Sequence, residues 1–245
     1  MSALMLAVDT ATDIASVAVG DGSGVNSGAH QQGSRRHAAE IVRLIDFALS
    51  RAGAQIADLD GVVVGDGPGS FTGLRIGWAA AKGLVQESGA DVIAVPSLMA
   101  AAAGAAERVG SVPVAACFDA LRGQVYGALY VVHADRVDTI VPPTLATIAE
   151  LEGLAGARRP ALAVGDGAVR FGAEVTKWTG VPPVPLDQLP PSAVVMLALA
   201  GRPGAGRRIE DFGTAEPEYG RPAEAQVKWE ARHGRQLPRS TDAPR

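Results

Sequence analysis

Residues 61–77, GVVVGDGPGSFTGLRIG, contain the strand, turn and helix start that decide the fold. The apolar run Val62–Val64 predicts a buried strand, and a glycine-rich turn leads from it into a helix. A matching segment, ALAVGDG at residues 161–167, follows at an offset of 100 residues, and Phe71 and Phe171 keep that offset. This repetition indicates an internal duplication, with a chance recurrence of Gly-Asp-Gly in a glycine-rich chain as the alternative.

Apolar spacing predicts alternating strands and helices on both sides of this segment. The elements expected in the first half are strands at 3–8 and 15–20, a helix at 36–52, a strand at 60–65, a helix at 74–87, a strand at 92–95 and a helix at 97–108. In the second half, strands at 112–118 and 125–132 repeat the opening hairpin, and Asp119 repeats the position of Asp9 at the end of its first strand. The alternation predicts an α/β protein.

The composition indicates a folded body with closely packed elements. The chain has 245 residues, 47% hydrophobic and 20% charged, which is enough for a sizeable core in one large or two small domains. It contains 45 alanines and 30 glycines but only 4% aromatic residues. We expect an N-terminal lobe at 1–108, a second lobe at 109–215, and a C-terminal segment at 216–245 that ends in a partly disordered tail.

Charge and cysteine content exclude several classes of protein. The net charge of −4 provides no global basic field for nucleic acid, so RNA contact is expected at most from the Arg-rich C-terminal region, for which a solvated terminus is the preferred interpretation. The single cysteine, Cys117, excludes an internal disulfide and a cysteine-cluster zinc site. The sequence shows no signal peptide and no apolar stretch that is long enough to span a bilayer. A cytoplasmic protein without membrane contact is therefore expected.

The turn after the strand at 60–65 does not match the familiar phosphate-binding motifs. The Lys-Ser/Thr of a P-loop is absent, and Thr72 stands where a dinucleotide-binding fingerprint needs glycine. Gly73, Gly77 and Ala81 instead form a small-residue ridge at four-residue spacing, which would let another helix approach closely. Internal helix–sheet packing, a partner interface and an anion-binding turn are the three interpretations of this segment.

A duplicated α/β body with an aspartate closing the first strand of each half resembles the actin-like superfold of sugar kinases and heat-shock ATPases (ASKHA, RNase H-like). In that superfold the two hairpins hold the phosphates and metal of a nucleotide, which requires carboxylates and nearby glycines. Here Ala11 and Leu121 stand where glycine would admit a phosphate. The resulting nucleotide site, vestigial or working, would consist of Asp9, Thr10, Thr12 and Asp119.

Four stretches together resemble the TsaB family, also called YeaZ, over roughly residues 3–228. They are ALMLAVDTATDIASVAVG at 3–20, Arg36-His37, GDGPGSFTGLRIG at 65–77 and PEYGRPAEAQ at 217–226. The resemblance implies a two-lobed actin-like fold and a role in placing threonylcarbamoyl on the adenosine beside the anticodon of tRNAs that read A-starting codons. It also implies a non-catalytic subunit that supports a catalytic paralogue, TsaD, together with a P-loop ATPase, TsaE.

The resemblance further implies pairing through a four-helix bundle built from the first two helices of each partner, here about His37–Arg51 and Gly73–Glu87. The expected interface residues are His37, Ile41, Leu44, Ile45, Gly73, Leu74, Gly77, Ala80, Ala81 and Leu84. A bulky residue at Gly77 or Ala81 is expected to block pairing while leaving the fold largely intact. Contact with tRNA would be indirect, and the free chain would form either a monomer or a homodimer.

The chemistry-bearing residues agree with a non-catalytic role. The four histidines include no HxxxH pair that could hold a metal from one helix face, and Cys117 lies in an apolar strand. We therefore expect no catalytic residues, no metal site and no cofactor on this chain, with ATP and Mg²⁺ used by the complex. The alternative is an actin-like ATP-binding kinase or ATPase that uses Asp9 and Asp119.

Overall fold

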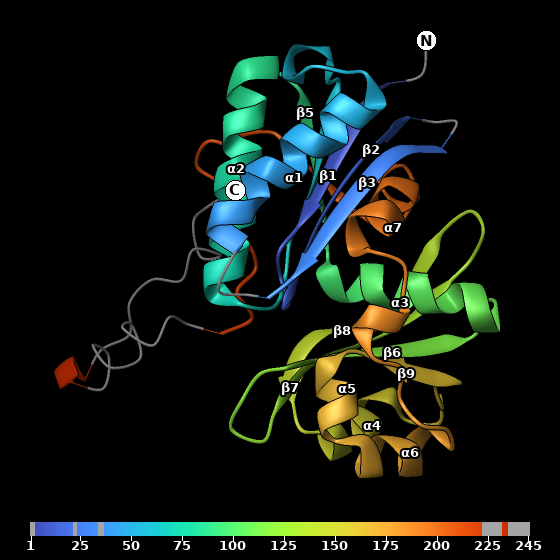
Figure 1. Cartoon of the computed structure of the whole chain (residues 1–245). Helices are drawn as coiled ribbons and strands as arrows, with labels where there is room; N and C mark the ends of the chain where they lie inside the picture. Colours follow the sequence, from blue (N-terminus) through green and yellow to red (C-terminus); the bar gives the residue numbers. More distant parts are fainter. Residues whose placement is uncertain (1–2, 22–23, 34–36, 222–231, 235–245) are drawn as a thin grey trace.

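The structure is a computed structural model that describes residues 3–21, 24–33, 37–221 and 232–234. It contains two β-sheets that lie one beyond the other, with helices around and between them (Figure 1). The first sheet has the strand order β10-β5-β4-β1-β2-β3. Its strands are β1 (Met5–Asp9), β2 (Ile14–Asp21), β3 (Gly24–Gln32), β4 (Gly61–Gly65), β5 (Asp91–Val95) and β10 (Arg207–Ile209).

The second sheet has the strand order β8-β7-β6-β9. Its strands are β6 (Pro113–Asp119), β7 (Val125–Val132), β8 (Val137–Ala146) and β9 (Leu162–Val164). The helices are α1 (His37–Ala52), α2 (Phe71–Ser88), α3 (Ser97–Val109), α4 (Ile148–Ala155), α5 (Asp166–Arg170), α6 (Gly172–Thr179) and α7 (Ser192–Leu199). None of the helices in the described part of the chain is long and apolar enough to cross a membrane.

The two halves share one topology, which confirms the predicted duplication. In the first sheet β1 and β2 form an antiparallel hairpin, β3 extends it, and β4 adds to β1 in parallel. In the second sheet β6, β7, β8 and β9 repeat these four relations in the same order. Two RNase H-like sheets in one chain define the actin-like architecture, as expected.

Three strands, β3, β8 and the three-residue β10, were not predicted from the sequence, and the two longer ones have clear physical reasons. β3 reads GVNSGAHQQ and is mostly exposed at the edge of its sheet, so it lacks the alternating apolar pattern of a half-buried strand. β8 carries Pro142 and Pro143, residues that argue against a strand in sequence and are tolerated at a sheet edge, where β8 lies.

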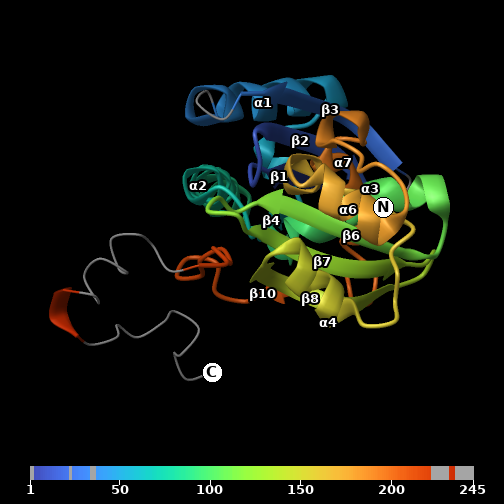
Figure 2. The ribbon, with the colours of Figure 1, turned by 90° about the horizontal axis from the view of Figure 1, so that it is seen from below.

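The helices form layers around the two sheets. Helices α1 and α2 pack side by side on one face of the first sheet, and α7 packs on the opposite face (Figures 1 and 2). Helix α3 packs on β6, β7 and β9 and also contacts α7, so these two helices lie between the sheets. The core between the sheets therefore draws residues from both halves, including Val63 from β4 and Phe118 from β6.

The chain returns to the first sheet after crossing the second. Helix α7 packs on β1 and β2, and β10 pairs with the edge strand β5 through Arg208 and Ile93. The lobe boundaries at residues 108 and 215 stay a prediction. The expected tail from residue 233 lies outside the described residues, apart from His233 and Gly234.

Candidate functional site

Asp9 lies at the end of β1, where only 3% of the residue is exposed. Its Oδ1 accepts hydrogen bonds from the Ala11 amide at 3.1 Å and the Ser97 hydroxyl at 3.0 Å. A Cβ at Gly65 would lie 2.2 Å from the same oxygen, so the neighbouring strand β4 must carry glycine there. Asp9 thus links β1 to α3 and packs directly against β4.

The surroundings of Asp9 act on its ionisation in opposite directions. Burial raises the pKa of the Asp9 carboxyl, and hydrogen bonding with Ser192, Ala11 and Ser97 lowers it in part. Ser97 and Ser192 are the first residues of α3 and α7, and the positive end of a helix dipole favours a carboxylate. The carboxyl therefore joins two helix starts to the end of β1.

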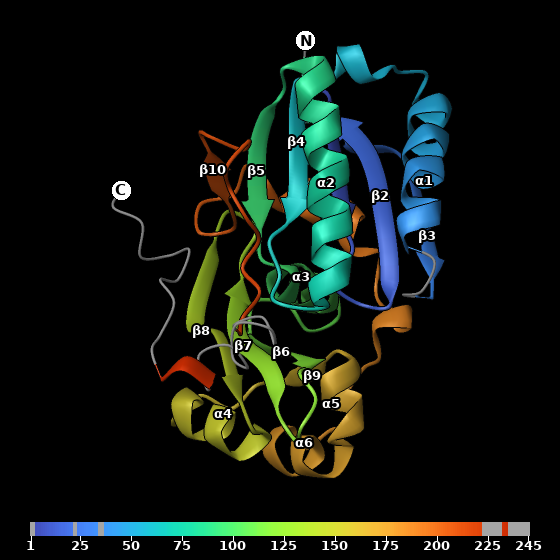
Figure 3. The same ribbon diagram turned by 90° about the vertical axis from the view of Figure 1, so that its left-hand side faces the viewer.

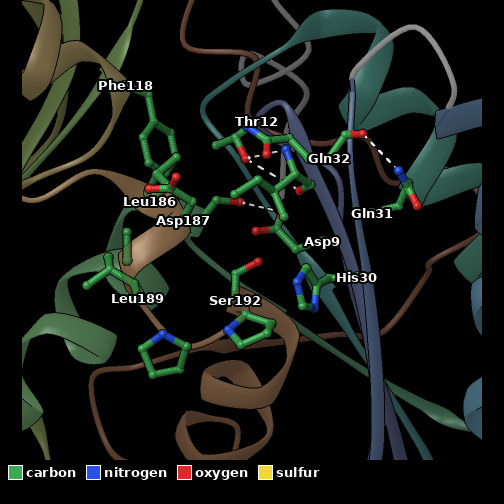
Figure 4. A pocket seen from close by; sticks show the side chains of 15 residues that line it. Asp9, Thr12, His30, Gln31, Gln32, Phe118, Leu186, Asp187, Leu189 and Ser192 are labelled. Carbon is green, nitrogen blue, oxygen red and sulfur yellow. Dashed lines mark hydrogen bonds between the residues drawn. The ribbon is translucent and has the colours of Figure 1, made fainter.

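A cavity of about 420 Å³ opens beside Asp9 (Figure 4). The first half contributes Asp9, Thr12 and His30, and the second half contributes Phe118 and the connection that contains Asp187 and Ser192. Among the described residues that line this cavity there is no lysine or arginine, whereas two are aspartates. The described lining therefore offers no lysine or arginine to the phosphates of a nucleotide.

The hydroxyl groups of Thr10 and Thr12 both form hydrogen bonds within the chain. The Thr10 hydroxyl is buried and donates to the Gly73 carbonyl at 2.7 Å. The Thr12 hydroxyl accepts from the Ile14 amide at 3.2 Å within a local turn.

Asp119 forms an ion pair with Arg170 and accepts a hydrogen bond from the Leu121 amide at 2.9 Å. It is absent from the cavity that Asp9 lines. The structure thus places Asp9 and Thr12 at one cavity, but not Asp119.

Most of the predicted interface residues point into the chain's own core. Those with buried side chains are Ile41, Ile45, Leu74, Ala81 and Leu84, while Leu44 and Ala80 are partly buried. His37 begins α1, and its side chain lies outside the described part of the structure. These side chains hold α1 and α2 to the first sheet.

The small-residue ridge of α2 also faces inward. A Cβ at Gly73 would lie 2.0 Å from the Thr10 carbonyl oxygen, and one at Gly77 would lie 2.3 Å from Thr10 Oγ1. Of the three interpretations of the ridge, the structure supports internal packing. The expectation that a bulky residue at Gly77 leaves the fold intact is wrong, because no room exists between α2 and the end of β1.

The outer face of α1 and α2 carries a different set of residues. Val42 and Phe47 on α1 are 67% and 53% exposed, and Phe71 at the start of α2 is 42% exposed. Ala79 and Gly83 lie on the exposed side of α2 at four-residue spacing, and a Cβ at Gly83 would meet nothing within 4 Å. We call these five residues the outer helix face. The sequence does contain a signal for the α2 part of it, because Ala79 and Gly83 lie opposite the apolar stripe of that helix. This stripe consists of Leu74, Trp78, Ala81 and Leu84.

An ion pair between a buried carboxylate and a half-exposed arginine was not predicted from the sequence. Asp66, in the turn after β4, is 5% exposed and receives two hydrogen bonds from Arg207 on β10, at 3.1 and 3.2 Å. Burial raises the pKa of Asp66, and the charge of Arg207 lowers it in part. No local pattern could reveal this pair, because the partners lie 141 residues apart.

The described residues contain no group of three or more His, Cys, Asp and Glu side chains that could hold a metal ion.

Two aspartates at equivalent strand ends and two RNase H-like sheets define the class: a two-lobed protein of the actin-like fold. A family model for tRNA N6-adenosine threonylcarbamoyltransferase, TsaD, matches residues 29–179.

Curated relatives place the chain more narrowly. It is 30% identical to the tRNA threonylcarbamoyladenosine biosynthesis protein TsaB of Bacillus subtilis over 80% of this chain and 84% of that protein. It is 35% identical to TsaB of Escherichia coli over 58% of this chain, and that alignment spans 63% of the relative's length. The chain belongs to the TsaB family.

A solved structure from Pseudomonas aeruginosa, described as an uncharacterized protein with similarity to peptidase YeaZ, agrees with the fold. It superimposes with a TM-score of 0.73 at 26% identity, covering 89% of this chain and 100% of that one. The structure named YeaZ from the same organism gives a TM-score of 0.68 at 27% identity, over 81% of this chain and 91% of that one.

Proposed function

We propose that this chain takes part in the biosynthesis of tRNA threonylcarbamoyladenosine as a non-catalytic subunit that pairs with the catalytic paralogue TsaD. The names of its TsaB relatives and the match to the TsaD family model support the pathway. The P-loop ATPase TsaE, tRNA contact through the complex and a homodimer of the free chain are further predictions of the same proposal.

The outer helix face carries the proposal. Three large apolar side chains of these two helices are exposed, and exposed apolar surface on neighbouring helices favours a protein–protein contact. Ala79 and Gly83 are small and exposed, so the backbone of a second helix can approach α2 there. The pairing surface that we propose lies on the two helices that the family resemblance implies, but on their opposite faces.

The residues around the cavity beside Asp9 support independent catalysis less than they support an accessory role. Asp119 is paired with Arg170, and Asp9 is engaged by Ser97 and the Ala11 amide. Nucleotide hydrolysis by the two aspartates would require both to reach one metal–phosphate group. An ATPase or kinase that uses Asp9 and Asp119 therefore ranks below the accessory subunit.

Substitution of Gly83 tests the pairing surface directly. Gly83→Leu adds a side chain to the exposed side of α2, and leucine favours a helix more than glycine does, so the fold should be retained. The variant is co-expressed with tagged TsaD from the same source, and the recovered ratio of the two proteins is measured. We expect recovery to fall to background, with a melting temperature of the isolated variant that equals or exceeds the wild-type value.

Gly153→Leu on α4 is the matched control. Gly153 is also a helical glycine with nothing within 4 Å of its Cβ, but it lies on the second lobe. It should pair with TsaD at the wild-type ratio. Recovery of Gly83→Leu at the same ratio would reject the outer helix face as the pairing surface. Light scattering of both isolated variants shows in parallel whether the free chain forms a homodimer through this face.

A further inference from the structure

Residues 210–221, which we call the C-terminal strap, run from the first sheet to the second. The strap begins directly after β10, at the edge of the first sheet next to β5. Figure 3 shows the chain descending from β10 beside β5 toward β7 in the second sheet. Contacts along its length attach it to both halves of the molecule.

The first attachment is to helix α2. The ring of Phe212 is buried, 5.0 Å from the ring of Trp78. The Lys82 ammonium donates to the Gly213 carbonyl at 2.8 Å and the Ala215 carbonyl at 3.0 Å. One aromatic pair and one bidentate ammonium thus hold this part of the strap against the first lobe.

The second attachment is to the turn after β4. The Glu218 amide donates to the Asp66 carbonyl at 2.9 Å. A Cβ at Gly67 would lie 2.5 Å from the Glu218 carbonyl oxygen, so the glycine of this turn admits the strap. The ring of Tyr219 then lies 4.6 Å from the ring of Phe71.

The last two strap residues reach the second lobe. Gly220 has a φ of +72°, and a Cβ on it would lie 2.8 Å from Pro68 in the first lobe and 2.6 Å from Tyr126 on β7. The Arg221 guanidinium donates to the Ala120 carbonyl at 2.6 Å and lies 5.7 Å from the centre of the Tyr126 ring. Gly220 therefore sits between the two lobes, and Arg221 fastens the strap to the β6–β7 hairpin.

We propose that the C-terminal strap holds the two lobes in one relative orientation. Helices α3 and α7 already join the sheets through the shared core, and lobes joined at one place can rotate as rigid bodies. The strap adds a second connection along another edge, from α2 to the β6–β7 hairpin. The relative orientation of the lobes is then fixed by contacts between the chain's own residues.

A spin-label distance measurement on the isolated full chain tests the strap. Labels are attached to Glu87→Cys at the end of α2 and Glu152→Cys on α4, both exposed positions in different lobes. The native Cys117 is fully buried and stays unlabelled. We expect one narrow distance distribution for the otherwise wild-type chain.

Two substitutions loosen the strap at opposite ends. Arg221→Ala removes the attachment to the second lobe, and Lys82→Met removes the one to the Gly213 and Ala215 carbonyls. Each should broaden the distribution and add a longer-distance population. Arg208→Ala is the matched control, because Arg208 lies on β10 and its ion pair is with Asp91 of the first lobe.

Distributions for Arg221→Ala and Lys82→Met that coincide with the wild type, in variants with native circular dichroism, would overturn the proposal. If the distance distribution of Arg208→Ala broadened as much as that of Arg221→Ala, the proposal would also be overturned. The broadening would then not depend on the contacts of the strap. TsaD is absent from the experiment, so its outcome is independent of the proposed pairing function.

Discussion

Asp9 and Asp119 close equivalent strands in the two halves, but their surroundings differ. Asp9 is enclosed by donors from α3 and its own turn, whereas Asp119 is half-buried and paired with a cation. Asp9 therefore serves as a buried link between β1 and two helix starts. This role has a consequence for stability that depends on pH.

The raised pKa of Asp9 predicts how its contribution to stability changes with pH. The folded protein holds this proton to higher pH than the unfolded chain, where the ordinary value is 3.8. The stabilisation is complete below the unfolded-state pKa and is lost as pH rises through the folded-state pKa. The unfolding free energy of Asp9→Asn relative to wild type should therefore increase as the pH rises above the ordinary value of 3.8. Urea unfolding at a series of pH values on both sides of 3.8 measures the difference.

Asp138→Asn provides the control of opposite sign. Hydrogen bonding and charge from Arg136, with His133, lower the pKa of Asp138, so its contribution is present at neutral pH and lost in acid. The unfolding free energy of Asp138→Asn relative to wild type should therefore decrease as the pH rises. A pH-independent difference for Asp9→Asn would contradict the burial argument.

Helix α2 has two faces that both carry small residues for different reasons. Gly73 and Gly77 let the helix approach the end of β1, where the Thr10 hydroxyl bonds the Gly73 carbonyl. Ala79 and Gly83 are exposed, and a Cβ at Gly83 would meet nothing within 4 Å. The same residue type should therefore respond oppositely to enlargement on the two faces.

Alanine at each glycine tests this difference within one helix. Gly77→Ala places a methyl group 2.3 Å from Thr10 Oγ1 and should cost about 1–3 kcal/mol of unfolding free energy. Gly83→Ala meets open space and should gain up to about 1 kcal/mol, because alanine favours the helix. Urea unfolding measures the change in unfolding free energy for both variants, and equal m-values show that the two unfolding transitions can be compared. Equal effects of the two substitutions would show that the faces are wrongly assigned.

At the scale of the whole molecule, the two lobes share one continuous core. The alanine-rich helix α3 has ten buried residues and fits between the sheets because its side chains are small. The same core includes Ala7 and Val63 from the first sheet with Ala116 and Tyr130 from the second. The abundance of alanine thus reflects close packing between the lobes as well as within them.

A shared core predicts that both lobes unfold together. Cys117 on β6 is fully buried, and burial raises the pKa of its thiol to about 12, so a thiol reagent should react with it only after unfolding. In a Trp178→Phe, Trp229→Phe background, Trp78 fluorescence reports the first lobe. The urea midpoints for Cys117 labelling and Trp78 fluorescence should coincide. Separate midpoints would show that the lobes unfold independently.

Much of the fold could be predicted because it follows from local patterns. The opening hairpin whose first strand ends at Asp9, the helices α1 and α2, and the repeated Gly-Asp-Gly turns all appear in apolar spacing and glycine positions. The strands β3 and β8 could not, since exposed edge strands are held by backbone hydrogen bonds more than by side-chain burial. The candidate site was predicted less well. The four-residue spacing of Gly73, Gly77 and Ala81 identifies one face of α2, but it does not show which part of the protein covers that face.

By itself, the sequence determined the α/β class, the duplicated order of elements and the family, since these depend on residues close together in the chain. Only the tertiary structure decided which face of α2 is free, that Asp119 is paired with Arg170, and that the C-terminal strap bridges the lobes. The physical reason is the same in each case. Whether a small or charged residue is available to a partner depends on contacts with residues many positions away, and those contacts form only when the chain folds.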